Sequence, residues 1–235
     1  MIISGLQKMT LLDYPGRVAC TVFLQGCNFR CPFCHNSGLL GAAQDDTIPV
    51  ETLLDFLRKR VGILDGVCIT GGEPTLQPDL PQLLRQIKEM GYHIKLDTNG
   101  SRPAMLKALV KDGLIDYVAM DIKNSPDRYA QTIGLSSLPA EIKESMTFLM
   151  EGLLPYEFRT TVVEEFHDED AILALGQWLA ELSPRHKAKR LFLQPYADRD
   201  SVLVRGLHTP SSENLRRFKE ILTPYAEFVD IRGTD

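Results

Sequence analysis

Short strand-like apolar runs alternate with amphipathic helical segments along nearly the whole chain, and this alternation constrains the fold more than any other feature. The strand-like runs lie at 18–24, 66–70, 92–97, 115–121, 156–163 and 190–195. Leucine, isoleucine and methionine recur at helical spacing at 49–60, 80–90, 103–112, 139–151 and 169–182. Strands separated by helices form parallel βαβ units with right-handed crossovers. A full eightfold barrel needs about 250 residues, so 235 residues predict an α/β fold, a partial (β/α)6 barrel.

The remaining segments fit one domain spanning 1–235. Residues 5–17 are expected to form a lead-in with a turn at Tyr14-Pro15-Gly16, and 39–48 an irregular connection. A last helix at 211–223 and a short strand at 227–231 close the chain. No repeat, low-complexity tract or linker divides it.

Charge and hydropathy exclude several classes of function. With 26 basic and 31 acidic residues the net charge is −5, which argues against a nucleic-acid-binding surface. No apolar run approaches the roughly 20 residues that cross a bilayer, and the first residues lack a secretory pattern. The sequence therefore predicts a cytoplasmic protein with reduced thiols and no membrane partner.

Three of the five cysteines, Cys27, Cys31 and Cys34, are spaced C-x3-C-x2-C directly after the first strand. Thiolates on one short loop can converge on a metal centre. A fully ligated iron–sulfur cluster takes four cysteines, and no fourth follows nearby, so a 4Fe–4S cluster here would keep one iron open to an external ligand. Two alternatives are a structural zinc ion with His35 as fourth ligand and three unligated core cysteines. Cys20 and Cys68 fit buried apolar positions.

Polar clusters follow most strands, at the ends where parallel α/β proteins place their active sites. They are Gly71-Gly72-Glu73-Pro74, Asp97-Thr98-Asn99-Gly100, Asp121-Ile122-Lys123 and Gln194-Pro195-Tyr196, whereas Arg159 lies within its strand.

Each cluster suits a different chemistry. Gly71 and Gly72 would let the backbone approach a ligand and present carbonyls to an amino group. Lys123 and Arg159 are donors for a carboxylate. The oxygens of Asp97, Thr98 and Asp121 could hold a monovalent or hard divalent cation. The structural alternatives are that Asp97 caps a turn, that Asp121 and Lys123 form a solvated pair, and that Arg159 is a satisfied strand residue.

These motifs resemble the radical S-adenosylmethionine (SAM) superfamily, in which an aromatic residue such as Phe33 precedes the last cysteine. The segments Gly5-Leu6-Gln7, Asp13-Tyr14-Pro15-Gly16 and 25–36 resemble anaerobic ribonucleoside-triphosphate reductase activating proteins. Those are short radical SAM enzymes akin to the pyruvate formate-lyase activating enzyme. The likeness to the latter extends to Gly71-Gly72-Glu73, 96–100 and Asp121-Ile122-Lys123.

The resemblance implies a radical SAM fold and a cofactor site. Cys27, Cys31 and Cys34 would hold the 4Fe–4S cluster, and a monovalent cation would lie at Asp97, Thr98, Asp121 and the carbonyl of Ala119. The cofactor site would be lined by Phe33, His35, Gly71, Gly72, Glu73, Asp121, Ile122, Lys123 and Arg159. One departure is Ala197, where the relative has a histidine near the cofactor's sugar.

The activity implied is reductive cleavage of SAM to a 5′-deoxyadenosyl radical, which takes hydrogen from a glycine Cα of a partner enzyme. The implied partners are an anaerobic ribonucleotide reductase and a flavodoxin- or ferredoxin-like electron donor. Two other functions stay open: a radical SAM enzyme acting on a small molecule, as 7-carboxy-7-deazaguanine synthases do, and a non-catalytic iron–sulfur or zinc protein.

Overall fold

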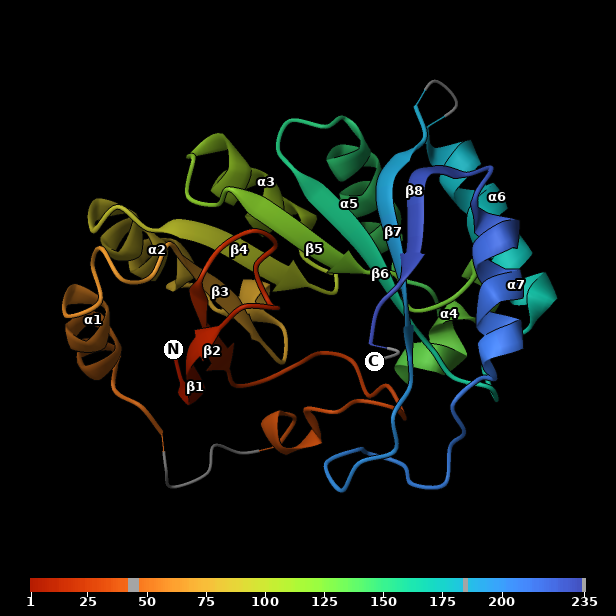
Figure 1. Cartoon of the computed structure of the whole chain (residues 1–235), viewed down its shortest axis with the longest axis horizontal. Coiled ribbons are helices and arrows are strands. Elements are labelled where there is room, and N and C mark those ends of the chain that lie inside the picture. The colour runs from red at the N-terminus through yellow and green to blue at the C-terminus, as the bar shows by residue number, and fades with distance from the viewer. Residues whose placement is uncertain (42–46, 184–185, 234–235) are drawn as a thin grey trace. The chain divides into compact units, whose positions relative to one another are not determined.

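The computed structural model describes residues 1–41, 47–183 and 186–233, and Figure 1 shows its elements. The strands are β1 (Ile3–Thr10), β2 (Ala19–Leu24), β3 (Gly66–Gly71), β4 (His93–Thr98), β5 (Tyr117–Asp121), β6 (Tyr156–Val162), β7 (Ala188–Pro195) and β8 (Ala226–Ile231). The helices are α1 (Val50–Arg58), α2 (Leu80–Glu89), α3 (Pro103–Lys111), α4 (Pro126–Ile133), α5 (Ala140–Met150), α6 (Glu169–Leu182) and α7 (Ser212–Leu222). Two short 3₁₀ helices are η1 (Ser37–Leu39) and η2 (Pro74–Leu76).

The strands follow one another in the sheet in chain order. β1 pairs antiparallel with β2, while β2, β3 and β4 are parallel, as are β6, β7 and β8. The chain divides into two compact units. The first comprises Met1–Asn28, Gly38–Thr98 and Arg102–Ala119, and the second comprises Phe29–Ser37, Asn99–Ser101 and Met120–Asp235.

In the first unit, helices α1 and α2 bury the leucine-rich faces that the sequence predicts. Leu53, Leu54 and Leu57 of α1 are fully buried, as are Leu80 and Leu84 of α2. Strand β3, Gly66–Gly71, is buried along nearly its whole length. A strand that is apolar on both faces is typical of a parallel sheet covered by helices, and its last residues lead directly into the Gly71-Gly72-Glu73 turn.

In the second unit, α7 lies alongside β8, as Figure 1 shows. Its buried residues are Leu215, Phe218 and Leu222, spaced three and four apart on one helical face. The side chain of Ser211 caps this helix by accepting a hydrogen bond from the amide of Asn214, 3.1 Å away. The helices at 49–60, 80–90, 103–112, 139–151, 169–182 and 211–223 are thus confirmed to within two residues at each end.

Two elements differ from the sequence prediction. Residues 3–10 of the expected lead-in form β1, which the alternation did not reveal because its polar centre carries Gln7 and Lys8 and its partner β2 has to be present to pair with it. Helix α4 was also missed. Its start has the expected signals, Ser125 before Pro126, but its eight residues are too few for a clear period. Among the described residues, no helix is long and apolar enough to cross a membrane.

Helix α4 ends at Gly134, whose φ of +69° is left-handed. A Cβ atom at this position would lie 2.9 Å from the carbonyl oxygen of Arg30, which belongs to the cysteine loop. The amide of Arg30 in turn donates to the carbonyl of Ile133, 2.8 Å away. These contacts hold Arg30, near the start of the Phe29–Ser37 segment, against the end of α4.

We expect Gly134→Ala to lower the free energy of unfolding by about 2 kcal/mol, the sum of left-handed strain and the contact with Arg30. Gly152→Ala is the matched control, since Gly152 has a φ of +73° but nothing within 4 Å of its Cβ position. Urea unfolding followed by circular dichroism measures both, and equal losses in the two variants would contradict the contact.

Candidate functional site

The two later cysteines are presented by a tight turn. The amide of Cys34 donates to the carbonyl of Cys31, 3.0 Å away, so both side chains leave one compact turn. Cys31 is 5% exposed and Cys34 is partly exposed. Neither forms a disulfide, nor does Cys27.

Cys27 is positioned by the backbone at the end of β3. The amide of Gly72 donates to the carbonyl of Leu24 at 2.9 Å, and the amide of Glu73 donates to that of Gly26 at 2.8 Å. A Cβ atom at Gly72 would overlap the Gly26 carbonyl and lie 3.2 Å from the Cβ of Cys27. The backbone that precedes and includes Cys27 therefore rests directly on this turn.

Gly71 and Gly72 are required by the packing of the chain's own backbone, a reason that the sequence did not indicate. Gly71 has a φ of +125°, and a Cβ atom there would overlap the backbone of Leu24. In the direction of a Cβ atom, both positions are filled by the chain's own backbone. That these glycines also let the backbone approach a ligand stays a prediction. Their carbonyl role toward an amino group stays a prediction.

Glu73 is fully buried and engaged within the first unit. Its Oε1 accepts hydrogen bonds from the Thr75 amide at 3.0 Å, from the Thr75 hydroxyl, and from the Thr98 hydroxyl at 2.8 Å. It caps η2 and joins this turn to the end of β4. The carboxylate thus fixes the glycine turn.

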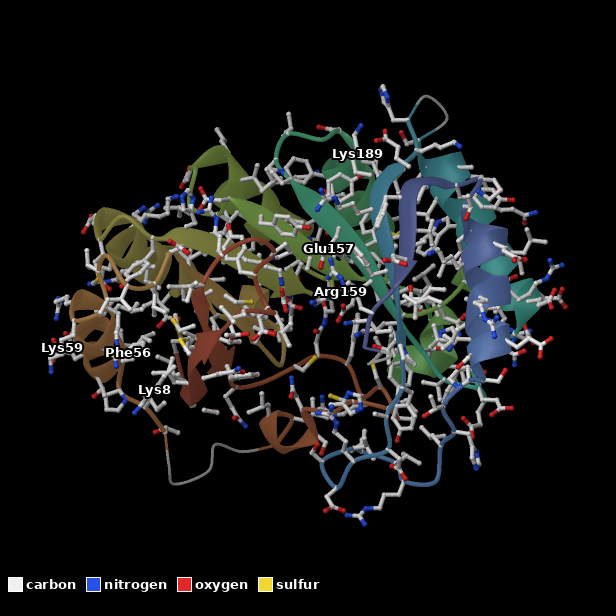
Figure 2. All side chains as sticks on the ribbon, viewed as in Figure 1. Lys8, Phe56, Lys59, Glu157, Arg159 and Lys189 are labelled. Atoms are coloured by element: carbon white, nitrogen blue, oxygen red, sulfur yellow. The ribbon has the colours of Figure 1, made fainter. Side chains whose placement is uncertain are left out.

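Asp121, Lys123 and Arg159 form one ion-paired group in the second unit. Asp121 Oδ2 lies 2.8 Å from Lys123 Nζ, and Asp121 Oδ1 lies 3.0 Å from Arg159 Nε. Burial raises the pKa of the Asp121 carboxyl, but the two cations outweigh it and hold the pKa well below its usual range. Burial lowers the pKa of Lys123, whereas Asp121 and then Cys31 raise it, and the net shift is upward. Figure 2 shows Arg159 on β6, within the strand as predicted.

His35 lies against the segment after β7. Its ring stacks on that of Tyr196, with centroids 5.6 Å apart and an interplanar angle of 5°. Its Nε2 is 2.7 Å from the carbonyl oxygen of Ala197. Further ties run from Ser37 Oγ to the carbonyl of Ser201 at 2.6 Å and from the Val204 amide to the carbonyl of Pro32 at 2.8 Å. The pyruvate formate-lyase activating enzyme was expected to have a histidine at the position of Ala197. In this chain the backbone carbonyl of Ala197 instead orients His35, a histidine of the cysteine loop.

Phe33 and Ile122 are apolar members of the predicted site. Phe33 is 2% exposed, and its ring centroid lies 5.8 Å from that of Phe166 and 6.5 Å from that of His167. Ile122 is fully buried, and its amide donates to the Arg159 carbonyl at 2.8 Å.

Sequence reasoning missed His167, whose Nε2 lies 3.0 Å from the carbonyl oxygen of Lys123. Its burial lowers its pKa, so the ring is neutral near pH 7. A lone histidine after a strand carries no distinctive spacing, and no sequence signal would have found it.

The candidate cation ligands have partners from the chain itself. Asp97 forms an ion pair with Lys95, Thr98 donates to Glu73, and Asp121 binds Lys123 and Arg159. Within the ranges that the structure describes, no three His, Cys, Asp or Glu side chains form a group that could hold a metal ion. The carboxylates of Asp97 and Asp121 are already neutralised by cationic side chains of the protein. This arrangement therefore does not fit the predicted monovalent cation.

The residue types on the cysteine loop, rather than a preformed group of ligands, fit an iron–sulfur cluster. Soft thiolates are the ligands that such clusters take, and Cys27, Cys31 and Cys34 lie on one loop outside any disulfide. Cys31 is one of the groups that raise the pKa of Lys123, so a cation lies near this cysteine.

Comparison with known proteins agrees with these features. A sequence model of the radical SAM superfamily matches residues 21–175. A protein of Methanocaldococcus jannaschii that is named as a glycyl-radical enzyme activating enzyme is 31% identical over 98% of this chain and 95% of its own. The pyruvate formate-lyase 1-activating enzyme of Escherichia coli is 26% identical over 97% of each chain.

A solved radical SAM methyltransferase from Sphaerobacter thermophilus superimposes with a TM-score of 0.71 at 17% identity, covering 96% of this chain and 69% of the other. At that identity the likeness shows the fold alone. It is the α/β fold with an open, partial-barrel parallel sheet found in radical SAM enzymes, which confirms the predicted fold class.

Removing the Glu73 carboxylate should destabilise the first unit. Glu73→Ala leaves three buried donors without this acceptor, so we expect a loss of about 3 kcal/mol or more in the free energy of unfolding. Glu73→Gln retains an Oε1 acceptor and should lose about 1 kcal/mol. Urea unfolding of both variants tests this, and equal stability of the two would refute the assignment.

Asp121→Asn should lower stability by about 2 kcal/mol at pH 7, because it removes the charge shared by two cations. A carboxyl with a lowered native pKa stabilises the fold above its unfolded pKa, and this contribution is lost as the pH falls through the native value. The difference between wild type and variant should therefore be constant from pH 7 to 5 and shrink once the pH falls below about 4. Urea unfolding across this range measures it, and a difference that grows on acidification would contradict the ion pairing.

Proposed function

Because this chain belongs to the radical SAM superfamily and is homologous to glycyl-radical enzyme activating enzymes, we propose that it installs a glycyl radical on a partner enzyme. The family implies a 4Fe–4S cluster and SAM. When bound, these supply a 5′-deoxyadenosyl radical, which takes a hydrogen atom from a glycine Cα. The cysteine turn, with a lysine next to Cys31, is the observation that carries the proposal.

We assign the three cysteines Cys27, Cys31 and Cys34 to the cluster. The backbone of Gly71 and Gly72 would meet the amino group of SAM, and Phe33 and Ile122 would form apolar walls. His35, held by Tyr196 and Ala197, would orient the loop. Glu73, predicted to line the cofactor site, would act at least through the turn that it fixes.

Charge supports a carboxylate ligand in the second unit. Lys123 and Arg159 are two cations that lie beside Asp121, with Arg159 pairing through Nε. Ammonium and guanidinium groups are suitable donors for a carboxylate, so the carboxylate of SAM would accept from them. Asp121 meanwhile holds both cations in place.

We propose an anaerobic ribonucleotide reductase as the partner, on the likeness of the lead-in and cysteine loop. A flavodoxin- or ferredoxin-like protein would supply the electron, and the setting would be the cytoplasm. The segment after Pro195 offers a contact surface, since an open cavity of ≈ 390 Å³ there is lined by Asp198, Arg199, Asp200 and Arg205. The loop at 37–48 would contribute as well, and its residues 42–46 lie outside the described part of the chain.

The cluster assignment is tested by iron content after anaerobic reconstitution. Cys31→Ala should lose the cluster, because two thiolates cannot hold it. Cys20→Ala is the matched control: burial raises the pKa of this thiol to about 12, so it stays protonated and is no ligand. Full iron content in Cys31→Ala would refute the assignment.

The activity is tested by incubating the reconstituted protein anaerobically with a candidate reductase, SAM and a reductant. We expect a glycyl-radical doublet in the electron paramagnetic resonance spectrum and no signal with Cys34→Ala. If 5′-deoxyadenosine forms while candidate partners stay without a radical and a small molecule is consumed, the small-molecule function replaces this one.

A further inference from the structure

Lys95 is a buried lysine that the proposed site does not use. It lies on β4, is 1% exposed, and pairs in register with Cys68 of β3. Its Nζ forms an ion pair with the Asp97 carboxylate and lies 3.8 Å from the Sγ of Cys68. A lysine is rarely buried without a partner, because its charge loses hydration. The ion pair with Asp97 is what makes this burial tolerable.

The ion pair between Lys95 and Asp97 follows from the geometry of a single strand, β4. Residues two apart in a strand point to the same face, so Lys95 and Asp97 project side by side, whereas Ile94 and Leu96 are buried on the other face. The side chain of Lys95 is 2% exposed and that of Asp97 is 15% exposed. The ammonium is thus tethered beside the carboxylate, away from bulk solvent.

Asp97 is also the residue expected to bind a monovalent cation. Its negative charge is already balanced by Lys95, and a second cation at the same oxygens would be repelled by the ammonium. Thr98, the neighbouring candidate ligand, donates its hydroxyl proton to Glu73. Within the first unit, therefore, the chain itself supplies the positive charge that the predicted site lacks.

We propose that the Lys95 ammonium is a built-in counter-ion for Asp97 that replaces an exchangeable monovalent cation. The ion pair itself is observed in the structure, whereas its importance for catalysis rests on the proposed function. Lys95 is a positioning residue: it holds the Asp97 carboxylate at the end of β4. It follows that the protein needs neither sodium nor potassium, and that removal of the ammonium creates such a need.

The experiment compares reconstituted wild type and Lys95→Met in sodium, potassium and tetramethylammonium chloride at one ionic strength. Tetramethylammonium is too bulky to take the place of the ammonium. We expect the melting temperature of wild type to be the same in all three salts. That of Lys95→Met should be higher in sodium or potassium, because a cation that binds only the native state stabilises it.

Catalysis gives the second readout. The rate of 5′-deoxyadenosine formation by wild type should vary less than about twofold among the salts, whereas Lys95→Met should be about tenfold slower in tetramethylammonium than in the better of the other two. Lys95→Arg keeps a tethered cation and should stay indifferent to the salt.

Two controls separate the ion pair from general salt effects. Lys8→Met removes an exposed lysine of the same unit, labelled in Figure 2, and should behave as wild type. Lys95→Met/Asp97→Asn removes both charges of the pair, so its melting temperature should no longer depend on the cation.

Three results would overturn the proposal: a wild type that depends on sodium or potassium, a folded Lys95→Met that is indifferent to the salt, or a Lys95→Met that unfolds in every salt while the double variant folds. The melting temperatures require no radical chemistry. If the salt pattern appears but no glycyl radical forms on any partner, the counter-ion stands and the proposed function fails.

Discussion

The close approach of two backbone segments at the ends of β2 and β3 is the constraint on which the first unit's part of the site depends. Side chains at Gly71 and Gly72 would overlap the backbone of Leu24 and Gly26. Because nothing larger than glycine fits, the β3 turn can hydrogen-bond to the backbone beside Cys27. The position of Cys27, the proposed cluster ligand, thus follows in part from backbone packing.

Buried charge is the second organising feature, and in each case it is compensated nearby. Glu73 has three donors, Asp121 has two cations, and Lys95 has Asp97. A further example is Glu157, labelled in Figure 2, which is fully buried and forms two hydrogen bonds of 2.7 and 2.8 Å with Arg232. Such pairs cost desolvation energy, and they persist because removal of one partner would leave an uncompensated charge. They fix the polar strand ends in defined positions.

Most of the fold and the identity of the candidate site could be predicted from the sequence. Periodicity located seven strands and six helices, because helical and strand spacing are local properties of the chain. It failed at β1, whose signal is its pairing with β2, and at α4, which is too short to show a period. The C-x3-C-x2-C spacing and the resemblance identified the family, because a metal centre requires its ligands in a fixed order.

The sequence by itself determined most of the elements, the parallel βαβ units and the residue types gathered at the strand ends. Only the tertiary structure decided what those residues contact. It placed Glu73 inside the protein as a brace, put Ala197 and Tyr196 against His35, and gave Asp97 the ammonium of Lys95 as its partner. The reason is physical: a carboxylate's role depends on its nearest charge and on its burial, and both are set by strand register and packing, which residue spacing does not encode.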